Sequence, residues 1–327
     1  MKIPLLLKNE EPLKFPTHLW RKSFSMKITL RDRRFVIAIP FLWLILFFLI
    51  PFLLVFKISL STPILAVPPY EPIIEWFDGI LRINLNVGNY LRMIEDPFYA
   101  SGFMTSFMIA FMATFWCLLL GYLMAYAISK APRPWQPILL LMVILPFLTS
   151  FLVRVYAWIG ILSNDGFLNK FLLFLGIIDQ PRQFLYNDVA VTIGIVYCYL
   201  PFMILPIYAV LDKIDPSYIE AAHDLGARPW KTFWQITIPL SMPGILSGCA
   251  LVFIPAMGEF VIPEILGAPD NLMIGRIIWI EFFNNRDWPI ASTVAVVMLF
   301  LFVVPIMLSQ RFSGSHNSKI NNGRSTL

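Results

Sequence analysis

Residues 220–240 read EAAHDLGARPWKTFWQITIPL, a polar segment that lies between two long apolar runs. It combines an acidic start, two alanines, a glycine, three aromatic residues and a proline near its end. The whole chain has 327 residues, of which 58% are hydrophobic and only 14% are charged. A single water-soluble core would need a much more charged surface. The composition therefore predicts an integral membrane protein in which this segment is a folded insert.

Six apolar runs are long enough to cross about 30 Å of hydrocarbon, which takes about 20 helical residues. They cover residues 35–57, 101–128, 138–162, 189–211, 243–264 and 289–310. We therefore expect an all-α integral membrane domain of six transmembrane helices over residues 35–310. The first run is too long for a signal-peptide core and no small-residue cleavage motif follows it, so we expect it to be retained.

The distribution of Lys and Arg predicts the orientation of the chain. The segments that include both ends and the insert carry 17 of these residues, the opposite connections carry 7, and Arg154 lies inside a run. By the positive-inside rule, the tails at 1–34 and 311–327 are cytoplasmic, and so is the insert. The net charge of +5 then reflects membrane topology, and we expect no nucleic-acid partner.

Local signals predict that the insert forms two short helices. Asp215 followed by Pro216 is a typical helix start, because the carboxylate accepts from free N–H groups and proline at the first position loses no bond. Gly226 can take the left-handed conformation that ends this helix. Pro229 then opens a second helix, which we expect to end at Pro239. Its aromatic stripe comprises Trp230, Phe233 and Trp234.

The insert also matches a known motif. It resembles the EAA loop of binding-protein-dependent ABC importer permeases, whose pattern is EAA-x3-G-x9-I-x-L-P. The matching residues are Glu220, Ala221, Ala222, Gly226, Ile236 and Pro239, with isoleucine at position 238 in place of leucine. An ordinary amphipathic loop lying on the membrane is the simpler alternative. It does not account for the spacing or for the position between the fourth and fifth runs, so we expect this loop to couple the chain to an ATPase.

Other segments extend the resemblance over nearly the whole chain apart from the tails. VFIPAMGEFVIPEILGAPDNLMIGRIIWIEFFNNRDWPIA at 252–291 and FLVRVYAWIGIL at 151–162 are similar to the polyamine permeases, most closely to the putrescine-importer subunit. The resemblance implies a MetI-like transmembrane domain in a bacterial inner membrane. It also implies an ABC ATPase dimer that holds ATP and Mg, a second homologous permease, and a periplasmic polyamine-binding protein that delivers putrescine or spermidine.

Motifs for chemistry on this chain are missing. There is no G-x4-G-K-[ST] phosphate loop, H-E-x-x-H or G-x-S-x-G, and all three histidines lie outside the apolar runs. Cys117, Cys198 and Cys249 fall within runs, which favours packing over disulfides. We therefore expect no catalytic residue, cofactor or metal here. A permease for another solute and a secondary cation transporter remain alternatives, but the transporter leaves the insert unexplained.

Ionisable groups inside spans cost about 2.5–3.5 kcal/mol to insert, so each is a candidate for the substrate path. Arg154 and Glu259 both fall about 24 Å from the cytoplasmic side in straight helices. They could form a structural pair, or Glu259 could contact a cationic amine. Glu264 lies nearer the outer interface and would face the same path only if Pro263 bends the helix.

Aromatic residues near these charges are weaker candidates. Tyr156, Trp158, Tyr197 and Tyr199 lie in the outer half of the third and fourth runs, where ring faces could hold an amine. Aromatic residues at this depth also serve as interface anchors or packing residues. In the next outer connection, GFLNKFLLFLG at 166–176 has apolar positions typical of a short interfacial helix.

Overall fold

The computed structural model describes residues 30–77, 80–270 and 272–323, so most of the predicted N-terminal tail lies outside the described residues. The chain divides into two compact units, residues 1–54 and residues 55–327. The first unit holds α1 (Leu30–Leu44), a π-helical stretch η1 (Ile45–Leu49) and the start of α2 (Ile50–Ser59). Between Ile37 and Leu54, most apolar side chains of this helix are exposed. A helix that is apolar on all sides is typical of a membrane span.

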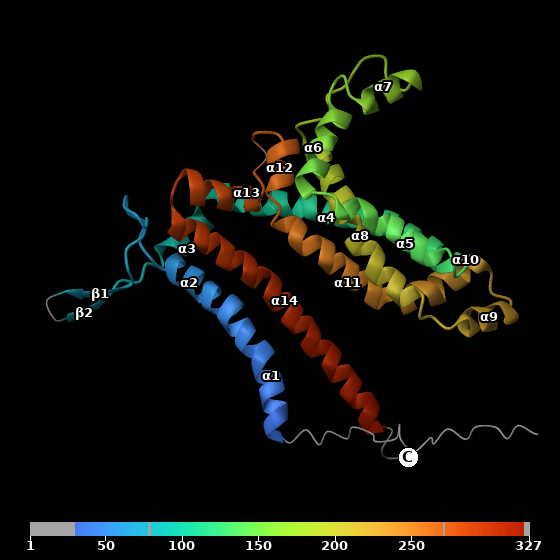
Figure 1. Ribbon diagram of the computed structural model, residues 1–327, viewed down its shortest axis with the longest axis horizontal. Coiled ribbons are helices and arrows are strands. Elements are labelled where there is room, and N and C mark those ends of the chain that lie inside the picture. The colour runs from blue at the N-terminus through green and yellow to red at the C-terminus, as the bar shows by residue number, and fades with distance from the viewer. Residues whose placement is uncertain (1–29, 78–79, 271, 324–327) are drawn as a thin grey trace, which may run out of the picture. The chain divides into compact units, whose positions relative to one another are not determined.

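Three long helices form the centre of the second unit (Figure 1): α4 (Pro97–Lys130), α8 (Asp188–Leu211) and α11 (Ile238–Met257). Small residues let these helices approach closely. A Cβ atom on Gly244 would lie 2.8 Å from the carbonyl oxygen of Pro206, and one on Gly248 would lie 2.7 Å from the sulfur of Met203. Any larger residue at these positions would push α11 away from α8.

Four described helices are long and apolar enough to cross a membrane, namely Ile37–Ser59, Pro97–Lys130, Asp188–Leu211 and Pro229–Met257. A bent pair, Gln136–Leu148 with Phe151–Phe174, makes five if it counts as one span, and Trp288–Val304 is a shorter apolar helix. Each of the six predicted runs thus overlaps a helix. The count of six spans is compatible with the structure and stays a prediction.

The third predicted run is not one straight helix. It comprises α5 (Gln136–Ile144), a 3-10 turn η2 (Leu145–Leu148) and α6 (Phe151–Leu162), and α7 (Phe167–Phe174) follows. The two halves meet at 88°. Pro146 in η2 removes a backbone donor, and the Thr149 hydroxyl donates to the carbonyl of Pro146 at 2.6 Å. Extended backbone at Thr149 then ends the first half.

The prediction that Pro239 ends a helix is wrong. α10 (Pro229–Thr232), the π-helical stretch η3 (Phe233–Thr237) and α11 form one helix from Pro229 to Met257. Pro239 lies in the first turn of α11, directly after η3. We attribute its tolerance to the wider π turn, which changes the carbonyl that the proline ring would otherwise meet. The fifth predicted run, 243–264, therefore starts earlier and stops at Met257, before α12 (Val261–Leu266).

The connections between the long helices carry the remaining elements. Between α2 and α4 lie an antiparallel hairpin, β1 (Ile74–Phe77) with β2 (Ile80–Ile83), and α3 (Gly88–Glu95). After α12 come α13 (Ile274–Trp279), the π-helical stretch η4 (Ile280–Asn284) and α14 (Trp288–Gly323). The membrane part is helical as predicted, and the hairpin is an addition in a loop. α14 also continues through most of the predicted C-terminal tail, because extending an existing helix is easier than starting one.

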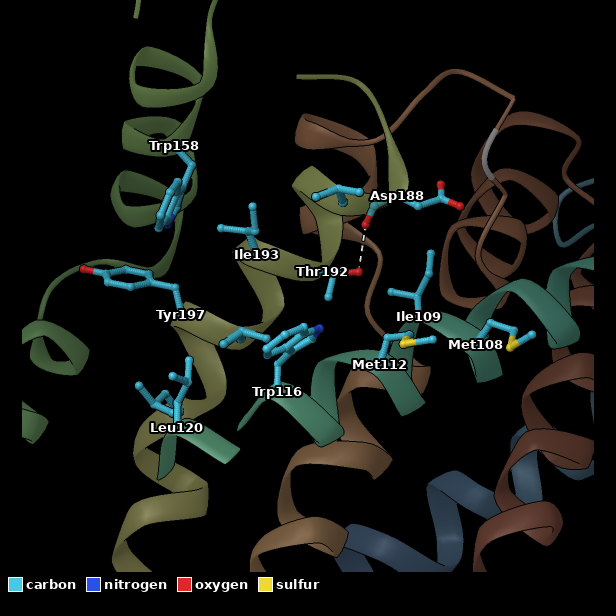
Figure 2. Close-up of a pocket in the computed structure, with 13 residues that line it drawn as sticks. Met108, Ile109, Met112, Trp116, Leu120, Trp158, Asp188, Thr192, Ile193 and Tyr197 are labelled. Atoms are coloured by element: carbon cyan, nitrogen blue, oxygen red, sulfur yellow. Dashed lines mark hydrogen bonds between the residues drawn. The ribbon is translucent and has the colours of Figure 1, made fainter. Parts of the chain in front are cut away.

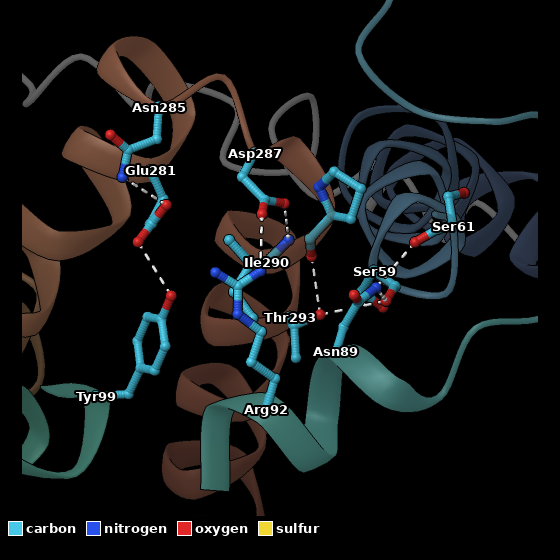
Figure 3. A network of polar contacts seen from close by, with 11 residues as sticks. Ser59, Ser61, Asn89, Arg92, Tyr99, Glu281, Asn285, Asp287, Ile290 and Thr293 are labelled. Carbon is cyan, nitrogen blue, oxygen red and sulfur yellow. Dashed lines mark hydrogen bonds and ion pairs between the residues drawn. The ribbon is translucent and has the colours of Figure 1, made fainter. Parts of the chain in front are cut away.

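A polar network links residues at the end of α2, in α3 and in α14 (Figure 3). The side-chain amide of Asn89, which is only 5% exposed, donates to the carbonyls of Ser59 and Ser61 at 2.9 Å each. The Thr293 hydroxyl donates to the Ser59 carbonyl at 3.2 Å. These bonds satisfy carbonyls that the end of α2 leaves free.

A second part of the network joins α4 to η4 (Figure 3). The Glu281 carboxylate is buried and accepts from the Tyr99 hydroxyl at 3.0 Å and from the Asn285 amide at 2.9 Å. Nearby, Arg92 forms an ion pair with Asp287 at 3.3 Å. Polar groups from distant parts of the sequence therefore fix this end of the second unit.

Candidate functional site

The first helix of the insert forms as its sequence predicts. The Asp215 carboxylate caps α9 (Pro216–Asp224) by accepting from the N–H of Ser217 at 2.9 Å, and this bond holds the pKa of the carboxyl below its usual value. Gly226 has φ of +78°, and the N–H of Ala227 donates to the carbonyl of Ala222 at 2.9 Å. The left-handed glycine therefore closes the helix and turns the chain toward α10.

Several apolar side chains of the insert remain exposed. Tyr218, Leu225, Trp230 and Trp234 are between 52% and 88% exposed. Phe233 instead packs edge-on against Tyr122 and Tyr126 of α4 at 5.8 and 5.4 Å, which anchors the base of the predicted aromatic stripe. Several exposed apolar side chains on an otherwise polar loop are typical of a protein-binding site. We name these four exposed side chains the insert patch.

The motif residues are distributed over both helices of the insert. Glu220, Ala221 and Ala222 lie on α9, Gly226 follows it, Ile236 lies in η3 and Pro239 lies in α11. Ala222 is buried, whereas Glu220 and Ala221 are exposed. Ala222 therefore lets α9 approach its neighbours, while Glu220 stays accessible.

Glu259 and Tyr199, both predicted as path residues, come together at a helix break. Residues 258–260 separate α11 from α12, and Glu259 lies in this break with 8% exposure. Its carboxylate accepts from the Tyr199 hydroxyl at 2.6 Å and from the N–H of Val261 at 3.0 Å. Together these two bonds fix the position of the carboxylate.

Arg154 does not form the structural pair with Glu259 that was one of our two alternatives. The described residues show no ion pair within 4.0 Å between Arg154 and Glu259. The Arg154 guanidinium lies 5.2 Å from the ring centre of Phe147 and 5.8 Å from that of Phe151, with 8% exposure. It lines a small cavity of 140 Å³ with Tyr197. Ring faces, which attract cations, therefore replace the carboxylate.

Glu264 lies on α12, whereas Glu259 lies in the break at 258–260 before it. The helix is therefore interrupted before Pro263 and not at this proline. The Glu264 carboxylate pairs with the guanidinium of Arg276 at 2.6 Å. Arg276 also donates to the carbonyls of Ala268 and Pro269 at 3.2 Å each. Sequence reasoning missed Arg276, since it lies in an outer connection where a single arginine gives no signal.

A groove of 790 Å³ lies between α4, α6 and α8 (Figure 2). Trp158 and Tyr197 line it with their rings 5.5 Å apart, edge to face. Its other walls are mainly apolar, and Asp188 at the start of α8 is its one carboxylate. Tyr156 is 58% exposed and does not line the groove. The predicted path residues therefore do not gather at one place, and the mainly apolar groove fits a polycation poorly.

The next features are groups that could bind a metal ion and the three cysteine thiols. Within them, no group of three or more His, Cys, Asp or Glu side chains could hold a metal ion. The three cysteines are free thiols, with Cys117 and Cys198 buried and Cys249 partly so. They form no disulfide, in agreement with the sequence analysis.

Comparison with known proteins places these features in context. Residues 117–313 match the family model described as binding-protein-dependent transport system inner membrane component. The spermidine/putrescine transport system permease protein PotB of Salmonella typhimurium strain LT2 is 37% identical over 296 residues, which are 90% of this chain and 99% of PotB.

Solved structures agree on the fold. A chain of a bacterial ABC transporter involved in the import of the acidic polysaccharide alginate matches with a TM-score of 0.62 and 16% identity, over 90% of this chain and 99% of that one. A chain of the MetNI methionine ABC transporter matches with a TM-score of 0.50 and 16% identity, over 65% and 94% of the two chains. At such identities the likeness concerns the fold alone.

Proposed function

Because the chain belongs to the family of binding-protein-dependent transport system inner membrane components, we propose that it is the permease subunit of an ATP-driven importer of polyamines, with putrescine as its cargo. The observation that carries this proposal is the identity of 37% over 99% of a spermidine/putrescine permease. Such a subunit is a transport component of the inner membrane and not an enzyme.

We propose Glu259 as a contact of the cargo. A diammonium ion needs carboxylates or ring faces where it leaves water. The Glu259 carboxylate accepts one hydrogen bond from the Tyr199 hydroxyl and a second from the N–H of Val261. Helix breaks inside membrane proteins commonly form substrate sites, because they leave polar groups available at depth. Glu264 is a weaker candidate, since Arg276 already pairs with it.

The proposal includes partners. The insert patch would dock on an ABC ATPase dimer, which holds ATP and Mg. A second homologous permease would complete the path, and a periplasmic polyamine-binding protein would deliver the cargo. Exposed tryptophans on the insert support docking, since aromatic residues are enriched at protein interfaces.

This arrangement requires cytoplasmic termini and a cytoplasmic insert. Cysteines introduced at Ser217 and at Asn86 test the orientation, with a cysteine-free variant as the control. In intact cells an impermeant thiol reagent should label the Asn86 site and spare the Ser217 site. Labelling at Ser217 in sealed cells would overturn the orientation.

Transport itself can be tested in proteoliposomes that contain this chain with an ATPase, a second permease and a binding protein from the same source. We expect ATP-dependent uptake of labelled putrescine, lost in Glu259→Gln while basal ATP hydrolysis continues. Uptake of spermidine without putrescine would overturn the cargo. Uptake by this chain alone, driven by an ion gradient, would favour the secondary transporter.

A further inference from the structure

After the 88° bend, the chain turns away from the direction of the long helices. The nine residues of α5 and the four of η2 pack along α4 and α8, and at 1.5 Å per residue they rise about 20 Å of the roughly 30 Å hydrocarbon. The pair Phe151–Phe174 meets them at 88°. In Figure 1, α6 and α7 leave the side of the bundle. A helix at right angles to spanning helices runs along the membrane plane.

One face of α7 is apolar and exposed. Phe167, Phe171 and Phe174, spaced at i, i+4 and i+7, are 71%, 47% and 86% exposed. The rings of Phe167 and Phe171 stack at 6.0 Å. This spacing places all three on one side of the helix.

The opposite face of α7 is fixed to the protein. Asn169 is fully buried, donates to the carbonyls of Ser163 and Arg182 at 3.1 and 2.8 Å, and accepts from the N–H of Arg182 at 2.9 Å. Leu168 packs against the main hydrophobic core. The phenylalanine face is therefore presented by an anchored helix and does not result from a loosely held loop.

Exposed apolar side chains also lie on the elements that precede α7. The exposed apolar side chains before it are Leu141, Met142, Leu145, Leu148, Leu152 and Val153, along α5, η2 and α6. Lys170 is exposed on α7 beside the phenylalanines. A lysine next to an apolar stripe can keep its stem in hydrocarbon and its ammonium group at lipid phosphates.

We propose that α7 is embedded in the outer leaflet, with Phe167, Phe171 and Phe174 among the acyl chains and Lys170 at the head groups. The connection between α6 and α8 is then a membrane-bound arm that braces the bend at Thr149. The exposed apolar side chains on every helix from α5 to α7 and the 88° bend favour lipid over a protein partner. This inference does not depend on the cargo.

A test uses the full chain co-purified with its partner subunits and reconstituted in vesicles of phosphatidylethanolamine and phosphatidylglycerol. In a variant with Cys117, Cys198 and Cys249 replaced by alanine, a nitroxide is attached at Phe171→Cys. The matched control is Asp179→Cys, an exposed residue of the following loop. Collision with dissolved oxygen and with a water-soluble nickel chelate is then measured at each site.

We expect the label at 171 to be open to oxygen and several-fold more protected from nickel than the label at 179. Phe174→Cys, one turn further on, should behave like Phe171→Cys. Equal nickel access at 171 and 179 would overturn the proposal. Protection at 171 from both reagents, or a change in its spectrum when the binding protein is added, would also overturn it in favour of a protein contact.

Discussion

Gly226 offers a direct test of the insert, because its replacement changes backbone energy and little else. Its φ is +78°, and a Cβ atom built there would meet no other atom within 4 Å. Gly226→Ala therefore adds no clash, and its cost is that of a left-handed L-residue, about 1–2 kcal/mol. Such a cost lowers the population of the native turn about 5- to 30-fold relative to alternatives. Gly226→Val should cost more, because a β-branched side chain tolerates positive φ poorly.

Gly176 supplies the matched control. It has φ of +67° and equally open space, but it follows α7 in the outer connection. Both alanine variants thus carry similar backbone strain on different sides of the proposed membrane. In reconstituted complexes, Gly226→Ala should lower substrate-stimulated ATP hydrolysis and uptake several-fold, and Gly176→Ala should leave the coupling between them intact. An equal loss in both variants, or normal coupling in an assembled Gly226→Val complex, would refute the reasoning.

Three further outcomes are expected. Uptake that is lost in Glu259→Gln should stay lost in the double variant Glu259→Gln with Arg154→Met, because Arg154 and Glu259 are not paired. Recovery of uptake in the double variant would support a structural ion pair. Asn89→Ala removes one donor from each of the Ser59 and Ser61 carbonyls and should lower the free energy of unfolding by about 1–3 kcal/mol. The thermal unfolding temperature should therefore fall further than for Asn86→Ala, and equal shifts in the two variants would contradict this. The pKa of Asp215 is lowered, so the stability that its cap gives to α9 is complete above the usual carboxyl pKa and is lost only as pH falls through the lowered value. At pH 7, Asp215→Asn should keep the stimulation of ATP hydrolysis, whereas Asp215→Ala should reduce it.

The features that could be predicted depend on neighbouring residues. Asp215, Pro216 and Gly226 act on backbone groups within a few positions, so the start and the end of α9 follow from local chemistry. The apolar runs likewise locate the helices. The motif that these residues share with ABC permeases indicated the family correctly, as the match over residues 117–313 shows.

The features that could not be predicted depend on direction and on distant contacts. Apolarity gives the length of a run but no information about its path, so the bend at Thr149 and Ser150 was not predicted. Pro239 carries a local stop signal that the π turn before it overrides. The bond between Tyr199 and Glu259 joins residues 60 positions apart, and only the packing of α8 against α11 brings them together.

The unbroken helix from Pro229 to Met257 has a mechanical consequence. Its 29 residues span about 43 Å, with the exposed Trp230 near one end and Glu259 just beyond the other. If this helix moves as one body, a tilt of about 5° at the insert would displace the far end by about 4 Å. That displacement exceeds the 2.6 Å that separates the Tyr199 hydroxyl from the Glu259 carboxylate. Spin labels at Trp230 and Met257 should keep a constant separation during turnover if the helix is stiff. A movement of the insert would then change the hydrogen-bond partner of the buried Glu259 carboxylate.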